Sequence, residues 1–196
     1  MTIILGMTGS IGMGKSTTAG FFREAGVPVW DADAEVHRLY ATGGAAVAPL
    51  ARLCPNALKD GAIDRAALKE WIAADPQALK QIESVVHPLV AASRMQFIAA
   101  HTEAGTPLIL LDIPLLFESG GDQLCHATLT VSAPPEEQRA RVMARPGMTE
   151  EHFQTILAKQ MPDAEKRARA THVIETLTPE QTRKQVLELI TKLTKG

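Results

Sequence analysis

A glycine-rich loop close to the start of the chain constrains the fold more than any other sequence feature. It occupies residues 9–16, GSIGMGKS, and follows the apolar run IILGM at residues 3–7. Glycines let successive backbone N–H groups turn inward and form a concave anion site without clashes from Cβ atoms. The next segment, residues 15–26, reads as a helix whose free N–H groups and dipole also favour an anion. Strand, loop and helix in this order predict an α/β protein with a phosphate site after its first strand.

The loop fits the pattern G-x-x-x-x-G-K-[ST] at each defined position. In this pattern Lys15 reaches the β- and γ-phosphates, and the hydroxyl of Ser16 can bind Mg²⁺. We therefore expect a bound nucleoside triphosphate with Mg²⁺. The expected nucleotide contacts are Gly9, Ile11, Gly12, Met13, Gly14, Lys15, Ser16 and Thr17.

Other interpretations account for the loop less well. A dinucleotide-binding loop requires G-x-G-x-x-G, and Gly12-Met-Gly14 begins this pattern, but position 17 is Thr17. A GTPase switch would carry N-K-x-D and D-x-x-G, and neither occurs in the sequence. A motor usually needs a longer chain. The sequence favours a kinase of a small molecule, with an ATP-dependent binding module as the alternative from another class.

Further apolar runs predict the remaining strands. They lie at residues 27–30, 108–112, 127–133 and 171–175, and helical segments separate them. This alternation predicts a doubly wound, parallel α/β sheet with right-handed crossovers. The closing helix carries Val186, Leu187, Ile190 and Leu193 on its predicted apolar face.

Residues 34–104 are predicted to be helical, with no convincing strand. Pro88 is predicted to begin a helix at its first turn. Two charged helices should follow the strand at 127–133, the first beginning near Pro135 and the second capped by Thr149.

Bulk composition limits the partners. The net charge is −2, which provides no global attraction to nucleic acid or to an anionic membrane. No apolar stretch reaches the length of a membrane span, so we expect a cytoplasmic protein. Cys54 and Cys125 are far apart and should be reduced, buried thiols. We expect a monomer or a weak homo-oligomer.

Two aspartates directly follow the second predicted strand. In extended backbone Asp31 and Asp33 would share a face, and one could orient and deprotonate an acceptor hydroxyl. A polar strand end with a helix cap explains the same residues equally well. Asp112 ends the strongest strand and is either a metal-facing acid or another cap.

Arg141 and Arg145 are spaced i, i+4 and should share one helical face. They could neutralise charge on a transferred phosphoryl group, as part of a mobile lid. A solvated charged helix is the more ordinary interpretation. His87 is more readily structural than catalytic, although it could lie near an acceptor.

Several motifs together make the chain resemble bacterial dephospho-coenzyme A kinases, over nearly its whole length. The motifs are GMTGSIGMGKST (6–17), VWDAD (29–33), GAIDRAAL (61–68), HPL (87–89), IPLLFE (113–118), RARVMAR (139–145) and ILAKQ (156–160). The resemblance implies transfer of the ATP γ-phosphate to the 3′-hydroxyl of the ribose of dephospho-CoA. The alternative is a P-loop kinase of another small alcohol or a nucleoside.

The resemblance also implies an architecture and residue roles. The implied parts are a P-loop core (1–33, 87–133 and 171–196), a helical acceptor-binding insertion (34–86) and a helical lid (134–170). The implied catalytic residues are Asp33, Lys15 and Arg141, with Arg145 at ATP and Asp33, Arg65 and His87 at the acceptor. One departure is the segment THVIETLTP (171–179), which lacks an asparagine often found there and should lie near the adenine.

Overall fold

The computed structural model describes residues 1–195, which form two compact units. The core unit comprises residues 1–30 together with the chain from residue 101 onward. The helical unit comprises residues 31–100. The chain therefore leaves the core after its second strand and returns to it near the end of one long helix.

A five-stranded sheet forms the centre of the core unit. Its order is β2-β5-β1-β6-β7. The strands are β1 (Ile3–Thr8), β2 (Val29–Asp31), β5 (Leu108–Asp112), β6 (Ala127–Ser132) and β7 (His172–Glu175). Strand β1 is parallel to both β5 and β6, and β6 is parallel to β7. The predicted parallel sheet is confirmed, and the strand that precedes the glycine loop lies in its middle.

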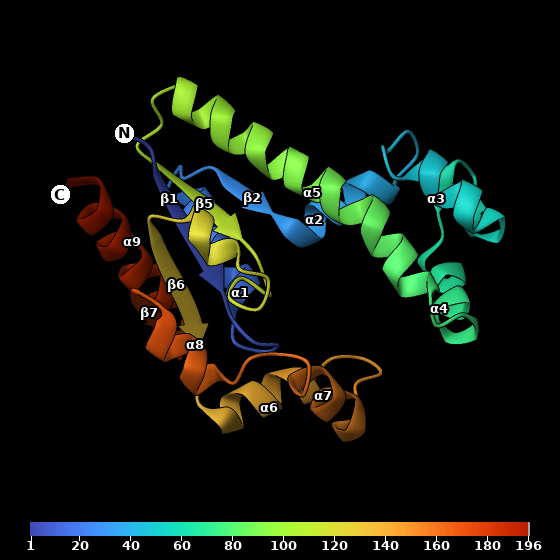
Figure 1. Cartoon of the computed structure of the whole chain (residues 1–196). Coiled ribbons are helices and arrows are strands. Elements are labelled where there is room, and N and C mark those ends of the chain that lie inside the picture. Colours follow the sequence, from blue (N-terminus) through green and yellow to red (C-terminus); the bar gives the residue numbers. More distant parts are fainter. Residues whose placement is uncertain (196) are drawn as a thin grey trace. The chain divides into compact units, whose positions relative to one another are not determined.

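The core unit also contains several helices. They are α1 (Lys15–Glu24), α6 (Pro135–Met143), α7 (Glu150–Leu157), α8 (Asp163–Arg169) and α9 (Pro179–Lys195), with a short 3₁₀ turn, η2 (Gly121–Leu124). Helices α1 and α9 pack together over an apolar cluster that includes Leu5, Phe22, Leu110 and Val186. Helices α6 and α7 lie beyond the carboxyl ends of β1 and β6 (Figure 1).

Local signals in the sequence explain several helix ends. Gly14 adopts a left-handed φ of 84° immediately before α1, and Gly26 adopts a φ of 82° just after it. Pro135 begins α6, where its missing N–H costs no hydrogen bond. The Thr149 side chain accepts a hydrogen bond from the backbone N–H of His152 and so caps α7. These predicted boundaries are confirmed.

The apolar face of α9 differs from the prediction at one position. Val186 and Leu189 are buried, and Ile190 and Leu193 pack against the same cluster. Leu187 instead is 49% exposed. The face that meets the sheet therefore includes Leu189 in place of Leu187.

The helical unit has its own apolar core. Its elements are α2 (Ala32–Tyr40), α3 (Val47–Leu53), η1 (Pro55–Ala57), β3 (Leu58–Lys59), β4 (Ala62–Ile63), α4 (Arg65–Ala74) and α5 (Ala78–Glu103), the last of which ends in the core unit. Leu39, Leu50, Leu68 and Ile82 are among the buried side chains that hold these elements together.

Two predictions for this unit are wrong. Strands β3 and β4 form a small antiparallel pair in a region that was expected to hold no strand. Pro88 lies inside the 26-residue helix α5 and does not begin a helix. A proline interrupts one backbone hydrogen bond, and packing of α5 against the buried cluster stabilises the helix across it.

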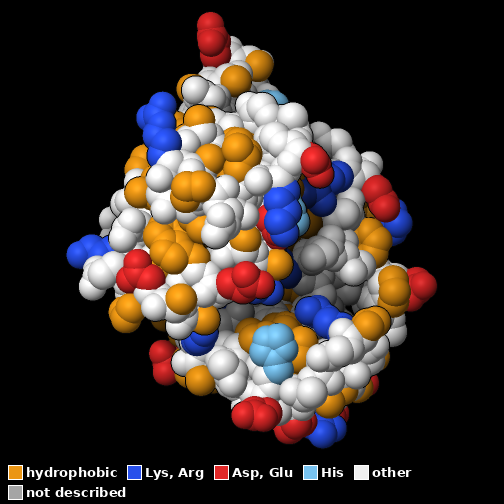
Figure 2. Space-filling model, turned by 90° about the vertical axis from the view of Figure 1, so that its right-hand side faces the viewer, with side chains coloured by type: hydrophobic (Ala, Val, Ile, Leu, Met, Phe, Trp, Pro, Cys, Tyr) orange, Lys and Arg blue, Asp and Glu red, His pale blue; other side chains and the backbone are white. Residues whose placement is uncertain are grey.

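The surface is mixed in character. Acidic and basic side chains are interspersed among scattered hydrophobic ones on the face in Figure 2. Within residues 1–195, every helix is too short or too polar to cross a bilayer. Cys54 and Cys125 are both half-buried, where full burial was expected.

Candidate phosphate-binding site

The glycine loop joins β1 to α1 in a conformation that requires glycine at two positions. Gly12 and Gly14 have φ values of 79° and 84°, a region that L-residues with a Cβ rarely adopt. A Cβ on Gly12 would lie 2.5 Å from Val142 Cγ2 and 2.9 Å from the carbonyl oxygen of Gln138. Backbone geometry and the neighbouring helix α6 both exclude a side chain here.

Lys15 pairs with the carboxylate at the end of β5. Its Nζ lies 2.7 Å from Asp112 Oδ1, and the Asp112 side chain is only 2% exposed. Register explains the pairing, because Met7, near the end of β1, is the Cα partner of Asp112. The two chemical groups expected to meet a triphosphate and its metal ion therefore lie in direct contact.

Two glutamines bond to the backbone N–H and carbonyl groups of Ile11 in the loop. Gln138 Nε2 donates to the Ile11 carbonyl oxygen at 2.8 Å. The Ile11 N–H donates to Gln160 Oε1 at 3.1 Å. Gln138 is a buried residue of α6, and Gln160 follows α7. The segment expected to act as a lid thus contributes directly to the shape of the phosphate loop.

Thr176 connects the loop to the predicted lid arginine. Its hydroxyl donates to the Met13 carbonyl oxygen at 2.9 Å and accepts from Arg141 Nη1 at 2.9 Å. Arg141 Nη2 also donates to the Thr176 carbonyl oxygen. The same side chain lies against Gly14, where an added Cβ would meet the Thr176 hydroxyl at 2.9 Å. Thr176 therefore fixes Arg141 beside the loop.

A cavity of about 310 Å³ opens next to these residues. It is lined by Gly14, Thr17, Arg141, Thr176, Leu177, Thr178, Pro179 and Thr182. Its wall includes the segment that was expected to lie near an adenine. The cavity adjoins the loop at Gly14 and the first turn of α1 at Thr17.

The two predicted lid arginines are not equivalent. Arg141 lies in α6 and is partly buried, whereas Arg145 is exposed and lies beyond the last residue of that helix. The expected shared helical face is therefore wrong, because α6 ends at Met143. Only Arg141 has hydrogen bonds to the wall of the cavity among the contacts found for this pair.

The two aspartates at the end of β2 and the start of α2 also differ from the expectation. Asp31 is the last residue of β2, and its carboxylate accepts from the Ala34 N–H as the N-cap of α2. Asp33 lies in the first turn of α2, so the backbone between them is not extended. Both belong to the helical unit, and Asp33 is exposed.

The other predicted acceptor residues also lie in the helical unit. Arg65 begins α4, where its Nη1 lies 3.2 Å from His37 Nε2 and its guanidinium stacks over Tyr40 at 5.5 Å. His87 is exposed in the middle of α5. Arg65, His37 and Tyr40 therefore form a mixed basic and aromatic surface cluster.

Sequence reasoning missed several residues around the loop. Gln138, Gln160 and Thr176 each contact the loop backbone. Gln160 ends the motif ILAKQ, and Thr176 lies in the segment that departs from the expected pattern. The motif and the departure from the pattern therefore lie in segments that contact the loop. The individual residues could not be identified, because their hydrogen bonds span more than a hundred residues and leave no local pattern in the sequence.

These features define a P-loop protein of the small-molecule kinase class. The sheet is parallel, a glycine loop precedes the first helix, and the lysine of the loop pairs with a carboxylate at the end of a strand. Comparison with known proteins narrows this class. A profile of the family described as dephospho-CoA kinase matches residues 3–179, and the chain belongs to that family.

Close relatives carry the same description. A dephospho-CoA kinase from Jannaschia sp. (strain CCS1) is 63% identical over 196 residues, covering 100% of both chains. A dephospho-CoA kinase from Cereibacter sphaeroides is 63% identical over 186 residues, covering 95% of this chain and 93% of the relative.

Solved structures agree with the fold. TT1252 from Thermus thermophilus has a TM-score of 0.83 and 40% identity, covering 100% of this chain and 99% of the other. Dephospho-CoA kinase from Campylobacter jejuni has a TM-score of 0.77 and 25% identity, with the same coverage. A shikimate kinase from Acinetobacter baumannii, at a TM-score of 0.54 and 18% identity over 98% of this chain and 93% of the other, shares the fold alone.

Proposed function

We propose that this chain transfers the γ-phosphoryl group of ATP to the 3′-hydroxyl of the ribose of dephospho-CoA. The hydroxyl oxygen forms a bond to the γ-phosphorus, and the bond between that phosphorus and the β–γ bridging oxygen breaks. The products are coenzyme A and ADP. The observation that carries this proposal is the phosphate loop with its Lys15–Asp112 pair, in a chain that belongs to the dephospho-CoA kinase family.

The phosphate loop binds and orients the donor. The Ile11 and Met13 N–H groups bond to Gln160 and to the Ser10 carbonyl oxygen, so other backbone N–H groups of the loop are proposed to contact the phosphate oxygens, and Lys15 contacts the β- and γ-phosphates. In the structure Lys15 Nζ lies 2.7 Å from Asp112 Oδ1. On nucleotide binding, Lys15 is proposed to share its hydrogen bonds between this carboxylate and the phosphate oxygens. Arg141, fixed beside the loop by Thr176, neutralises charge that develops on the phosphoryl group.

The donor set fits Mg²⁺ only together with the nucleotide. Ser16 and Asp112 offer oxygen atoms, which Mg²⁺ prefers, but no group of three or more acidic, histidine or cysteine ligands occurs within residues 1–195. Mg²⁺ characteristically binds one or two protein groups plus substrate phosphates. A bound Mg²⁺ would screen the charge of the phosphates during transfer.

Asp33 is proposed to orient the acceptor hydroxyl and to accept its proton. Its carboxylate is exposed in the first turn of α2, so it is available to a ligand. The helical unit is proposed to bind the acceptor, with Arg65 and His87 contributing. Arg65 suits a diphosphate group because a guanidinium forms paired hydrogen bonds with phosphate oxygens.

The segment 134–170 is proposed to act as the lid. It provides Arg141 and the two glutamines that hold Ile11, and Arg145 is proposed to contact ATP from the same segment. Closure of this segment would exclude water, which otherwise competes with the acceptor for the γ-phosphoryl group.

A coupled ADP-release assay over a panel of acceptors tests the function. With ATP and Mg²⁺ held constant, dephospho-CoA should give the largest kcat/KM, ahead of shikimate, gluconate, adenosine and water. The Lys15→Ala variant, as the matched control, should lose this activity because it lacks the cation at the β- and γ-phosphates. A higher kcat/KM for another alcohol than for dephospho-CoA would show that the acceptor is that alcohol. ADP release that is independent of every alcohol would indicate an ATP-dependent binding module.

A further inference from the structure

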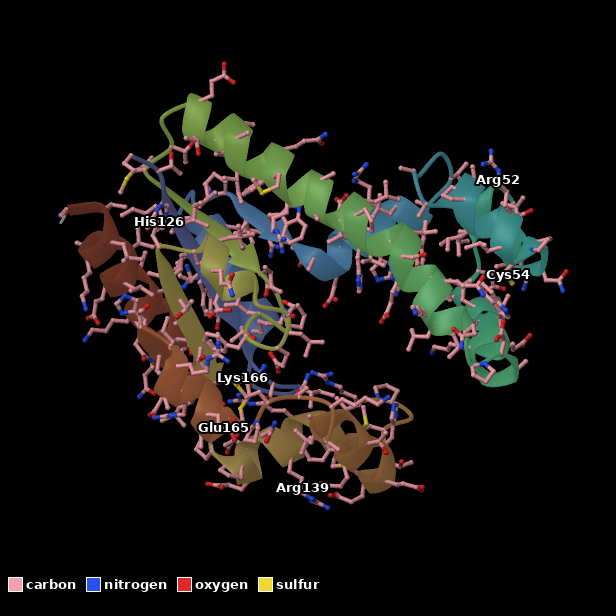
Figure 3. All side chains as sticks on the ribbon, viewed as in Figure 1. Arg52, Cys54, His126, Arg139, Glu165 and Lys166 are labelled. Carbon is pink, nitrogen blue, oxygen red and sulfur yellow. The ribbon has the colours of Figure 1, made fainter. Side chains whose placement is uncertain are left out.

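Lys166 is a buried cation that the proposed chemistry does not use. Its side chain is 0% exposed, and no other lysine or arginine within residues 1–195 is buried to this degree. It projects from α8 toward the sheet, whereas its neighbour Glu165 is exposed to solvent (Figure 3). Burial of an ammonium group is costly unless its protons are fully hydrogen-bonded. The partners of Lys166 therefore indicate what the residue is for.

Three acceptors surround the Lys166 ammonium group. Nζ lies 2.9 Å from Glu118 Oε1, 3.2 Å from the Pro114 carbonyl oxygen and 3.4 Å from Thr8 Oγ1. An ammonium group has three donor protons, so this set satisfies all of them. The Thr8 hydroxyl also donates to the Pro114 carbonyl oxygen at 2.8 Å. Nζ, the Thr8 hydroxyl oxygen and the Pro114 carbonyl oxygen are therefore bonded to one another in a triangle.

The segments that meet at Nζ are the two that build the phosphate site. Thr8 ends β1 and immediately precedes Gly9, the first glycine of the loop. Pro114 is two residues beyond Asp112, the partner of Lys15. A shift of either segment would change the distance between the loop and the Asp112 carboxylate.

The position of Lys166 is itself fixed by the sheet. Its backbone carbonyl oxygen accepts from Thr130 Oγ1 at 3.1 Å. Thr130 is the register partner of Thr8 on the neighbouring strand, so the two threonines lie side by side in β6 and β1. One threonine holds the backbone of Lys166 and the other meets its side-chain nitrogen.

Glu118 extends the network toward the lid segment. Besides pairing with Lys166, its Oε1 accepts from the Met161 N–H at 2.8 Å. Met161 follows Gln160, which holds the Ile11 N–H of the phosphate loop. The ion pair therefore reaches the loop by two routes, through Thr8 and through Gln160.

Stability alone does not account for such a pair. Buried ion pairs can often be replaced by hydrophobic residues of similar volume with no loss of stability, because desolvation offsets their attraction. We propose that Lys166 is a positioning residue of the phosphate site. Its ammonium group holds Thr8 and Pro114 at the spacing in which the loop and Asp112 together bind a triphosphate. The inference rests on the proposed function only for the identity of that triphosphate.

A double variant separates positioning from folding. Lys166→Met with Glu118→Gln removes both charges, fills the space of the lysine and keeps an amide oxygen for the Met161 N–H. We expect its melting temperature to stay close to that of the parent. Its Kd for ATP, measured by calorimetry without acceptor, should rise at least fivefold, while its KM for dephospho-CoA stays within twofold. The matched control combines Lys184→Met with Glu165→Gln, which changes one exposed lysine and one exposed glutamate of the core unit.

A folded double variant that binds ATP within twofold of the parent would overturn the inference. If the double variant does not fold, Thr8→Val takes its place, since it removes only the hydroxyl that meets Nζ and Pro114. Its melting temperature should fall, because the buried ammonium group loses one acceptor, so ATP binding is measured well below that temperature. Weaker ATP binding by the folded variant supports the inference, and parent-like affinity would overturn it. The ATP titration uses no acceptor. A parent that binds ATP but does not phosphorylate dephospho-CoA would therefore contradict the proposed function and leave this test intact.

Discussion

Ile11 illustrates how single side chains determine the phosphate loop. Its N–H and its carbonyl oxygen are each bonded to a glutamine, and both glutamines come from the segment proposed as the lid. A loop rich in glycine has many accessible conformations, so contacts to its backbone select the one that can bind phosphate. The affinity for ATP should therefore depend on residues that do not touch the nucleotide.

Replacing Gln160 with leucine tests this dependence. The Ile11 N–H would lose its acceptor, at a cost of about 1 kcal/mol for one hydrogen bond, which corresponds to roughly a fivefold rise in KM for ATP. Gln154→Leu is the control, because Gln154 is exposed on α7 and its side-chain amide donates to Glu150, away from the phosphate loop. Steady-state kinetics with varied ATP measure both. Equal KM values for the two variants would contradict the role assigned to Gln160.

Asp33 and Asp31 offer a matched pair for the proposed chemistry. Asp33→Asn should lower kcat by roughly 10²–10⁴-fold, the range for loss of a general base, while ATP affinity stays near that of the parent. Asp31→Asn should have a far smaller effect, because asparagine also serves as an N-cap for α2. The measurements are kcat and the calorimetric Kd for ATP. Near-normal turnover by Asp33→Asn would remove that residue from the mechanism.

At the scale of elements, the join between β1 and α1 allows a test of the loop geometry. Gly12→Ala places a Cβ at a φ of 79° and 2.5 Å from Val142 Cγ2, so we expect at least about 2 kcal/mol of destabilisation. Gly20→Ala, in the middle of α1, meets no atom within 4 Å and should stabilise the protein by roughly 0.5–1 kcal/mol. Urea denaturation of both variants measures these free energies. Equal effects would show that the loop tolerates a side chain.

Elements with a local signature were predictable from the sequence. The strand, glycine loop and first helix were predicted because an apolar run, glycines and a helix end at Gly26 lie next to one another. Strands β3 and β4 have two residues each, too few to show an alternating pattern. Helix α8 was also not predicted, because its buried residue is Lys166 and no apolar stripe marks its inward face.

The candidate site was predictable only in part for the same reason. The phosphate-loop residues follow a pattern of eight consecutive positions, residues 9–16, so they could be identified directly. Asp33 was identified as a candidate, but its helical backbone was not, because the N-cap role of Asp31 competes with continued strand. Thr176, Gln138 and Gln160 act through contacts that only the folded chain brings together.

At the scale of the whole molecule, each unit contains a carboxylate that should link its stability to pH. Burial raises the pKa of Glu118, but hydrogen bonds from Lys166 and from the Met161 N–H outweigh it, and the net pKa is below the usual 4.5. In the helical unit, the hydrogen bond from Arg38 lowers the pKa of Glu35 against the opposing effect of burial. Each carboxylate therefore contributes stability above its unfolded pKa, and this stability is lost as the pH falls through the lower folded pKa.

Glu118→Gln should therefore reduce the dependence of stability on acid pH. The free energy of unfolding, measured by urea denaturation between about pH 5 and pH 3, should fall less steeply in this variant than in the parent. Glu35→Gln should show the same change. Glu165→Gln, which replaces an exposed carboxylate of α8, is the matched control. Parallel curves for all four proteins would contradict the linkage.

The central place of β1 in the sheet has a consequence for synthesis. Its neighbours β5 and β6 begin at Leu108 and Ala127, after the whole helical unit has been made. At about 5–20 residues per second, the ribosome needs roughly 5–20 s to reach the first of them. During that interval residues 31–100 form a continuous piece with its own apolar core, while the apolar first strand has no partner and requires protection from aggregation. The glycine loop precedes its supports at Gln138, Gln160 and Thr176 by more than a hundred residues, so a nascent chain has no formed phosphate site until all three have been synthesised.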